Sequence, residues 1–218
     1  MKKRTLIIIF AMISNLSNGQ ALNGKWILKD VDSGNGKKGY PGFQLMEIKD
    51  KNVDVYTDFK LKKKVTSFII DDNNFLNSNN EVDSSFKIIN KNHFKWFVNG
   101  MANEKETIFE FDFYRLQPTI TTLVKEEIEK MTFSLIENGR EASLEFNKDL
   151  MDKELIKALK IKEGEKKVIE MIDSTLFVSM FWNGERTGSI PIKEVTSDFL
   201  KLYAVPTGPM EMIAYRKK

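Results

Sequence analysis

Short apolar runs separated by polar turn residues fill the first half of the chain, a pattern typical of antiparallel β-structure. In the clearest run, residues 109–113, phenylalanines alternate with acidic residues, so the rings face one side of a strand. A similar run precedes it at 94–98, and Asn99-Gly100 is expected to begin the turn between the two. Short connections between such strands predict an antiparallel meander, either a barrel or a sandwich. The expected strands are Lys25–Val31, Phe43–Lys49, Val53–Asp58, Lys64–Ile70, Phe75–Ser78, Ser85–Ile89, Phe94–Val98 and Thr107–Leu116.

The second half mixes helical and β patterns and predicts a smaller α+β unit with two short helices after Pro118. Thr119–Met131 has the spacing of a helix with one apolar face, and a second helix is expected from Asp149 to Gly164. Between them, Asn138-Gly139 is typical of a hairpin turn. The expected strands are Thr132–Glu137, Glu141–Phe146, Lys167–Ile172, Leu176–Trp182, Gly188–Ile192, Phe199–Val205 and Met210–Tyr215.

Similar short sequence segments recur in the two halves of the chain. Trp182-Asn183-Gly184 in the second half matches the tryptophan-containing strand that runs into Asn99-Gly100 in the first. This gives the hypothesis that residues 120–218 are a degenerate repeat of residues 22–119.

The first residues have the three parts of an export signal. The basic segment Lys2–Arg4 precedes an apolar run at 6–13, and Ser17 and Gly19 supply the small side chains expected before a cleavage site. The apolar run is too short to span a bilayer, which takes roughly 20 apolar residues. Residues 1–19 are therefore predicted to be a signal peptide. We expect an exported protein, periplasmic or secreted, without an integral membrane segment.

Removal of the signal peptide changes the charge of the chain. The full sequence has 34 basic and 31 acidic residues, and loss of Lys2–Arg4 leaves 31 of each. A neutral mature chain argues against nonspecific nucleic-acid binding, which depends on net positive charge. The chain has no cysteine, which excludes disulfides, thiolate nucleophiles and cysteine metal sites. An exported domain without disulfides must be held together by its core, and the remaining length is sufficient for one large or two small cores.

Residues that could carry chemistry are few. His93 is the only histidine, and the chain has no Gly-x-Ser-x-Gly nucleophile motif, so His93 is expected to be a solvated turn residue. The alternative for His93 is a contact to haem or substrate. The segment 71–83 is rich in Asp and Asn but departs from the EF-hand pattern, so turns are the main interpretation and a weak calcium site is the alternative. No catalytic residue, metal site or cofactor is predicted.

One basic cluster stands out, formed by Lys60 and Lys62–Lys64. The main interpretation is a solvated lysine face that protects a strand edge. The functional alternative is the binding of an acidic ligand headgroup at the mouth of a barrel.

The sequence Leu22-Asn23-Gly24-Lys25-Trp26 places a glycine two residues before a tryptophan at the start of a strand, directly after the signal peptide. This resembles the first strand of lipocalin-like (calycin-type) β-barrels, and the resemblance to small exported bacterial proteins of this type covers residues 22–119. It implies that Gly24 allows close backbone packing and that Trp26 plugs the closed end of the barrel. It also implies that Arg115, near the end of the last strand, stacks on Trp26. The family's Thr-Asp-Tyr motif is missing, because Thr57-Asp58-Phe59 comes too early in the chain.

Three functions are open at this point. The first is an exported, non-enzymatic protein that binds a small apolar or amphipathic ligand inside the barrel. The second is an envelope interaction or structural module with a filled core, in which Leu176, Val178, Met180 and Trp182 form a surface patch for a partner of unknown identity. The third is an enzyme that uses carboxylates or the segment 71–83. For the first function, the residues expected to line the ligand site are Phe94, Trp96, Phe109, Phe111 and Phe113.

Overall fold

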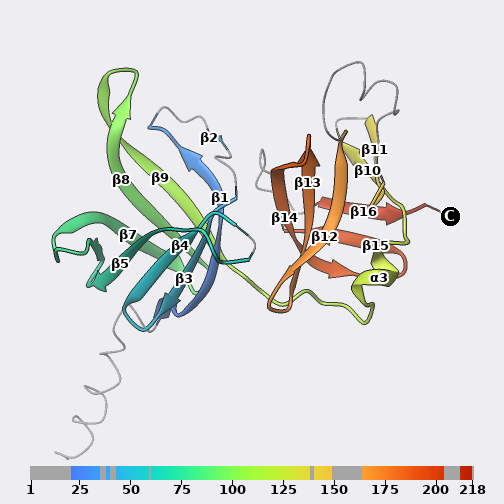
Figure 1. The fold of residues 1–218 in the computed structure, drawn as a ribbon, viewed down its shortest axis with the longest axis horizontal. Coiled ribbons are helices and arrows are strands. Elements are labelled where there is room, and N and C mark those ends of the chain that lie inside the picture. Colours follow the sequence, from blue (N-terminus) through green and yellow to red (C-terminus); the bar gives the residue numbers. More distant parts are fainter. Residues whose placement is uncertain are drawn as a thin grey trace, which may run out of the picture. The chain divides into compact units, whose positions relative to one another are not determined.

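The computed structural model describes residues 21–34, 38–39, 43–58, 60–137, 140–148, 164–203 and 212–217. The chain divides into two compact units (Figure 1). The first unit contains the described residues up to Lys38 and Gln44–Arg115, and the second contains Gly39–Phe43 and the chain from Leu116 onward.

The first unit is a closed antiparallel barrel (Figure 1). Its sheet has the order β2-β1-β3-β4-β5-β6-β7-β8-β9, and an additional pairing between β1 and β9 closes it. In that pairing, Trp26 lies opposite Arg115 and Val31 lies opposite Phe111. The closure confirms the predicted meander barrel. The strands are β1 (Gly24–Asp32), β2 (Lys38–Gly39), β3 (Leu45–Lys49), β4 (Asn52–Tyr56), β5 (Lys64–Asp71), β6 (Asn74–Leu76), β7 (Val82–Asn90), β8 (His93–Ala102) and β9 (Lys105–Arg115).

The turn between β8 and β9 is not where the sequence predicts it. Asn99 and Gly100 lie inside β8, opposite Ile108 and Thr107 on β9. The turn is formed by Asn103-Glu104, both of which have positive φ angles of 50° and 64°. The strands therefore continue beyond the predicted turn.

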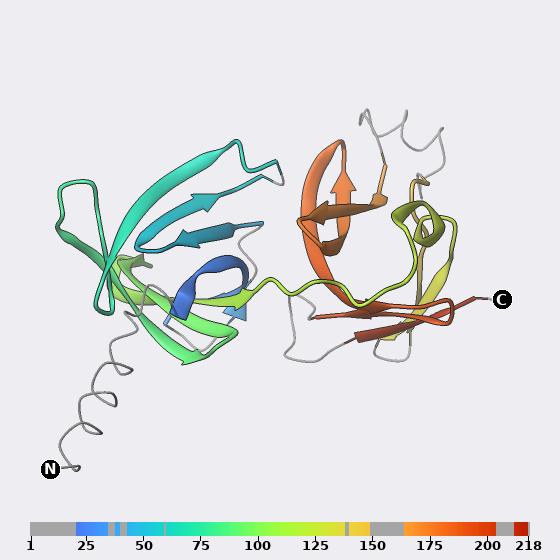
Figure 2. The ribbon, with the colours of Figure 1, turned by 90° about the horizontal axis from the view of Figure 1, so that it is seen from below.

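The described part of the second unit is one curled sheet of seven strands with the order β11-β10-β16-β15-β14-β13-β12 (Figure 2). The predicted hairpin around residues 138–139 is present, since Phe133 pairs with Leu144 and Glu137 pairs with Arg140. Apolar side chains from all the central strands form a separate core, which includes Phe133, Val178 and Leu200. The strands are β10 (Phe133–Glu137), β11 (Arg140–Leu144), β12 (Lys166–Ile172), β13 (Thr175–Trp182), β14 (Glu185–Val195), β15 (Phe199–Leu202) and β16 (Met212–Arg216).

The first predicted helix of this unit is much shorter than expected. Only α3 (Lys125–Ile128) is helical, and Ile128 is fully buried in the core. The chain before it is extended because its polar groups bond to the sheet: the Thr119 amide donates to Ser174 O, and Ile120 forms a parallel bridge with Glu194. The second predicted helix, from Asp149 to Gly164, lies outside the described residues except for its last position.

The surface patch predicted on β13 is wrong. Leu176 and Val178 are buried, and Met180 packs against the same core. Only Trp182, at the end of the strand, is exposed, at 42%. The side of the strand that carries Leu176 to Met180 therefore faces the core, a choice that alternation alone does not fix.

The repeat hypothesis stays a prediction, and the two Asn-Gly pairs that suggested it differ in structure. Asn183 and Gly184 form the turn between β13 and β14, with φ angles of 52° and 79°. Asn99 and Gly100 lie within a strand.

Candidate functional site

The end of the barrel where β1 begins is held by a set of contacts that we call the closed-end clamp, formed by Ala21–Gly24, Trp26 and Arg115. The guanidinium carbon of Arg115 lies 4.2 Å from the centroid of the Trp26 ring, in the stacked arrangement that the family resemblance implied. The Trp26 side chain is fully buried, and its indole N–H donates to Leu22 O at 2.7 Å.

Arg115 also donates to three backbone carbonyls, two of them in the clamp. Its Nη2 donates to Ala21 O at 2.8 Å, its Nη1 donates to Asn23 O, and its Nε donates to Lys91 O at 2.9 Å. Burial lowers the pKa of the Arg115 guanidinium from its ordinary value. One side chain thus joins the segment before β1, the β7–β8 turn and the end of β9.

Gly24 is required by this arrangement. Its φ is +133°, and a Cβ placed on it would lie 2.8 Å from Nη1 of Arg115. A side chain at this position would therefore be strained and would collide with the guanidinium. The predicted role of Gly24, to allow close packing, has this specific geometric basis.

Aromatic rings fill the barrel interior next to the clamp. Phe94 lies with its centroid 4.9 Å from Trp26 and 5.3 Å from Phe113, and all three side chains are fully buried. Trp96 is 7% exposed and contacts Phe111 at 5.1 Å. We call this set the aromatic ladder, and it continues through Phe68, Phe75 and Phe86.

The ladder includes four of the five residues expected to line a ligand site, and the fifth, Phe109, stands apart. Phe94, Trp96 and Phe113 are buried against other rings, whereas Phe109 and Phe111 are partly buried. Phe109 lies toward the opposite end of β9 from Arg115, beside Gly100, where an added Cβ would lie 2.8 Å from its ring. The Trp96 indole N–H donates to Ser84 Oγ at 2.7 Å inside the barrel, so its polar atom has a partner from the chain itself.

The lysine cluster lies on the loop between β4 and β5, at the end of the barrel opposite the clamp. Asp58 organises this loop, because its carboxylate accepts the backbone N–H groups of Lys60, Lys62 and Lys63 at 2.6 to 3.2 Å. Burial raises the pKa of Asp58, but these N–H donors outweigh it and the net shift is downward. The lysine side chains are exposed.

His93 is not a solvated turn residue, as the sequence suggested. Its side chain is 14% exposed, and its Nε2 lies 2.6 Å from Asp112 Oδ1. The imidazole stacks on Tyr114 with centroids 4.3 Å apart. Asp112 is 3% exposed and lies opposite Asp30, which is 5% exposed. These groups occupy the outer face of the barrel, away from the aromatic ladder.

The segment 71–83 forms the two turns that its sequence predicts. Asp72, with a φ of 50°, stands in the turn from β5 to β6. In the second turn, Asn77 Oδ1 accepts the N–H groups of Asn79 and Glu81. Among the described residues, no group of three or more His, Cys, Asp or Glu side chains is arranged to hold a metal ion.

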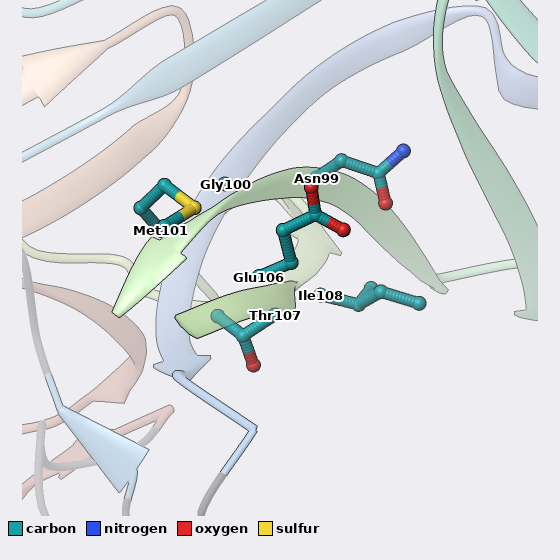
Figure 3. Close-up of a pocket in the computed structure, with 6 residues that line it drawn as sticks. All are labelled: Asn99, Gly100, Met101, Glu106, Thr107 and Ile108. Atoms are coloured by element: carbon teal, nitrogen blue, oxygen red, sulfur yellow. The ribbon is translucent and has the colours of Figure 1, made fainter. Parts of the chain in front are cut away.

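One hollow lies beside the far end of the β8–β9 hairpin (Figure 3). We call Val98–Ala102 and Lys105–Phe109 the β8–β9 arm. The hollow has a volume of about 580 Å³ and is lined by Asn99, Gly100, Met101, Glu106, Thr107 and Ile108. Met101 and Ile108 are 61% and 54% exposed. The arm therefore presents apolar side chains on the outside of the barrel.

A second hollow, of about 380 Å³, lies over β4, β5 and β6. Asp54 stands at its edge and accepts hydrogen bonds from Ser67 Oγ at 2.6 Å and Lys64 Nζ at 3.2 Å. The Ser67 hydrogen bond lowers the pKa of Asp54, and Lys64 adds to the shift. The apolar lining of this second hollow includes Ile69 and Leu76, which are cross-strand partners.

Comparison with known proteins gives no family for the chain. No family model and no curated protein matches it. Among solved structures, it is similar to a protein of unknown function of the DUF3598 family from Nostoc punctiforme, with 12% identity over 90% of this chain and 77% of that chain. The TM-score is 0.28, which is too low to support an argument about fold or function. The lipocalin-like relationship stays a prediction, and the closed barrel rests on the strand pairings. In the described residues, no helix is long and apolar enough to cross a membrane.

Proposed function

We propose that the protein is an exported, non-enzymatic interaction or structural module of the cell envelope, in which the barrel is a filled scaffold. The observation that carries this proposal is the aromatic ladder. Phe94 and Phe113 are fully buried, and the Phe94 ring contacts both Phe113 and the closed-end Trp26, so these phenylalanines occupy space that a carrier barrel keeps for its ligand. The signal peptide predicted at residues 1–19 supports export.

Satisfied polar groups also favour a scaffold. A ligand site usually combines an apolar cavity with a few polar groups that fix the ligand's orientation. Inside this barrel, the N–H groups of Trp26 and Trp96 already donate to Leu22 O and Ser84 Oγ. Both hollows described above involve outward-facing side chains, such as Met101 and Ile69. Contacts with other molecules are therefore expected on the outer surface.

The test is mass spectrometry of an organic extract of the natively purified protein, beside an unfolded control, repeated after exposure to a lipid mixture. A filled barrel gives an empty extract in both cases. Phe113→Ala is the matched variant, because it removes a fully buried ring and should leave a cavity that takes up a small aromatic probe. A stoichiometric molecule that leaves the wild-type protein on unfolding would contradict the scaffold.

Export is tested separately by the intact mass of the exported protein, which should begin at Gln20.

A second candidate is the binding of an amphipathic ligand at the end of the barrel opposite the clamp. It is favoured by the partial exposure of Phe109 and Phe111, and by the exposed lysines of the β4–β5 loop at the same end. A fatty acid would place its chain against the rings and its carboxylate near Lys62. Fatty-acid titration followed by tryptophan fluorescence should then show saturable binding that Phe109→Lys abolishes, and a flat titration removes this candidate.

A further inference from the structure

We propose that the loop between β4 and β5 docks the protein on the surface of a bilayer that contains anionic lipids. The docking surface is formed by Lys60–Val65, which we call the basic loop. This deepens the proposed function by naming the partner of the envelope module, and it rests on that function in taking a membrane to lie near the exported protein.

The basic loop has a fixed backbone. The Asp58 carboxylate accepts three of its N–H groups, and the carbonyl of Asp58 accepts the Leu61 amide at 3.3 Å. The Thr57 amide donates to Lys63 O at 3.2 Å. Leu61 is held at a φ of 51°, which residues other than glycine adopt rarely. A loop that is fixed before it binds a partner loses less conformational entropy on binding.

The loop carries more positive charge than the protein neutralises. The segment 58–64 has four basic residues and one acidic residue, a net charge of +3. Lys64 Nζ is paired with Asp54 Oδ1 at 3.2 Å. The side chains of the other three lysines are exposed and form no ion pair within the described residues. Three ammonium groups are therefore available to an outside partner.

Protection of a strand edge does not account for these lysines. β4 pairs with β3 and β5, and β5 pairs with β4 and β6, so the loop joins two inner strands of the sheet. Lysines that guard against strand pairing are expected on a strand with an open edge. The main interpretation of the lysine cluster from the sequence is thus correct for its exposure but wrong for the edge.

Apolar side chains stand in the same loop. The register of β4 and β5 shifts between Val55 and Tyr56, so that Val65 has no partner on β4. Such a bulge redirects a side chain, and Val65 is 60% exposed. Leu61, between two of the lysines, is partly exposed. The loop therefore presents apolar groups next to its charges.

Lysines beside exposed apolar side chains match the interface of an anionic bilayer. There, ammonium groups meet the lipid phosphates, and apolar side chains enter the boundary between the headgroups and the acyl chains. A soluble phosphate polymer would use the charge of the loop and leave Leu61 and Val65 in water. After residue 19 the chain has 31 basic and 31 acidic residues, so the attraction is local to this loop.

Sedimentation with vesicles tests the docking, on the chain that begins at Gln20. Residues 1–19 are omitted because their basic and apolar side chains would themselves bind anionic vesicles, and the shortened chain keeps every residue that the structure describes. It should bind vesicles of phosphatidylglycerol and phosphatidylcholine saturably, but not vesicles of phosphatidylcholine alone. Because salt screens exposed charges, about 0.5 M NaCl should release it. Absence of binding to the anionic vesicles overturns the proposal.

A triple variant locates the contact. Each lysine near an anionic surface changes the affinity about fivefold, so Lys60→Gln, Lys62→Gln and Lys63→Gln together should weaken vesicle binding by about 100-fold. Far-UV circular dichroism should be unchanged, because these side chains are exposed.

The matched control removes the same charge from elsewhere in the barrel. Lys51, Lys87 and Lys91 are exposed and lie outside the basic loop. Their joint replacement by glutamine should weaken vesicle binding by less than about threefold. Equal losses in the two triple variants contradict docking through this loop.

Val65→Ser tests the apolar part of the surface. It should weaken vesicle binding by about threefold or more, because less apolar area enters the bilayer. Val124→Ser is its control, since Val124 is 58% exposed and lies in the second unit, and it should leave binding unchanged. Soluble polyphosphate that binds as tightly as the vesicles, with no effect of Val65→Ser, would assign the loop to a soluble polyanion and overturn bilayer docking. The extraction experiment and the intact mass decide the filled barrel and export independently of these results.

Discussion

Replacement of Arg115 by alanine is the sharpest test of the closed-end clamp. The side chain makes one stacking contact with a fully buried ring and donates to three backbone carbonyls. The stacking contributes about 1 kcal/mol for a partly desolvated cation. Each charged hydrogen bond contributes about 0.5 kcal/mol here, since the carbonyls can be hydrated when the guanidinium is removed. Arg115→Ala should therefore lower the free energy of unfolding by about 2.5 kcal/mol.

The assay is urea unfolding of the full chain followed by tryptophan fluorescence. Two of the three tryptophans, Trp26 and Trp96, belong to the barrel, so a Trp182→Phe background makes the signal specific to that unit. Arg115→Lys should recover less than half of the loss, because an ammonium group cannot reproduce the planar fork of donors.

Arg216→Ala is the matched control, and because Arg216 lies in the second unit, its effect is measured in the chain that keeps Trp182, the tryptophan of that unit. Arg216 is also near a strand end, but it is exposed, and its Nη1 reaches only Ser197 O at 3.3 Å. Its replacement should change the unfolding free energy by less than about 0.5 kcal/mol. A loss of that small size for Arg115→Ala as well would refute the clamp as a source of stability.

Other parts of the barrel give predictions of the same kind. Gly24→Ala should destabilise the barrel by about 1–3 kcal/mol. Part of that loss should disappear in an Arg115→Ala background, because the collision with Nη1 of Arg115 is then absent. Strict additivity of the two losses in the double-mutant cycle would contradict this. His93→Phe keeps the stacking on Tyr114 but removes the hydrogen bond to a buried carboxylate, so we expect a loss of about 1–2 kcal/mol in thermal or urea unfolding, and no loss would show that the bond is unimportant. Glu104→Gly should stabilise the protein by about 0.5–1 kcal/mol, because the residue has a φ of 64°, and a less stable variant would argue against this turn. Ser67→Ala should raise the pKa of Asp54, measured by NMR titration, toward its ordinary value of 3.8. Since the folded pKa lies below that value, the stabilisation by the Ser67 bond is present above about pH 3.8 and is lost as the pH falls through the folded pKa; an unchanged titration would exclude Ser67 as the cause.

Local alternation was sufficient to predict most of the barrel. In the strand 64–71, for example, Phe68 and Ile70 are buried while Ile69 and Asp71 are exposed, and this period of two is written directly in the sequence. The contact between Trp26 and Arg115 came from a family resemblance, because nothing local to either residue specifies a partner far away in the chain. The local sequence therefore predicts the individual strands, whereas the resemblance to a known family adds a contact between residues far apart in the chain.

The failures have a common cause in contacts between distant residues. Asn99-Gly100 has the composition of a turn, but Gly100 is required to make room for the ring of Phe109. The environment of His93 depends on Asp112, which is 19 residues away and adjacent only once the register of β8 and β9 is known. Thr119 begins a helical pattern but bonds to the sheet of its own unit instead.

The closed-end clamp has a consequence for the order of folding. The hydrogen bonds of Arg115 to Asn23 and Ala21 span 92 and 94 residues, nearly the full length of the barrel. They cannot form until the last strand is available, and contacts of such separation are slow to form because the loop-closure entropy must be lost first. The part of the barrel's fluorescence that reports the contact of Arg115 with Trp26 should therefore appear in the slowest phase of refolding. Under the export that we propose, this order would leave the first and last strands unjoined until the whole barrel sequence is available.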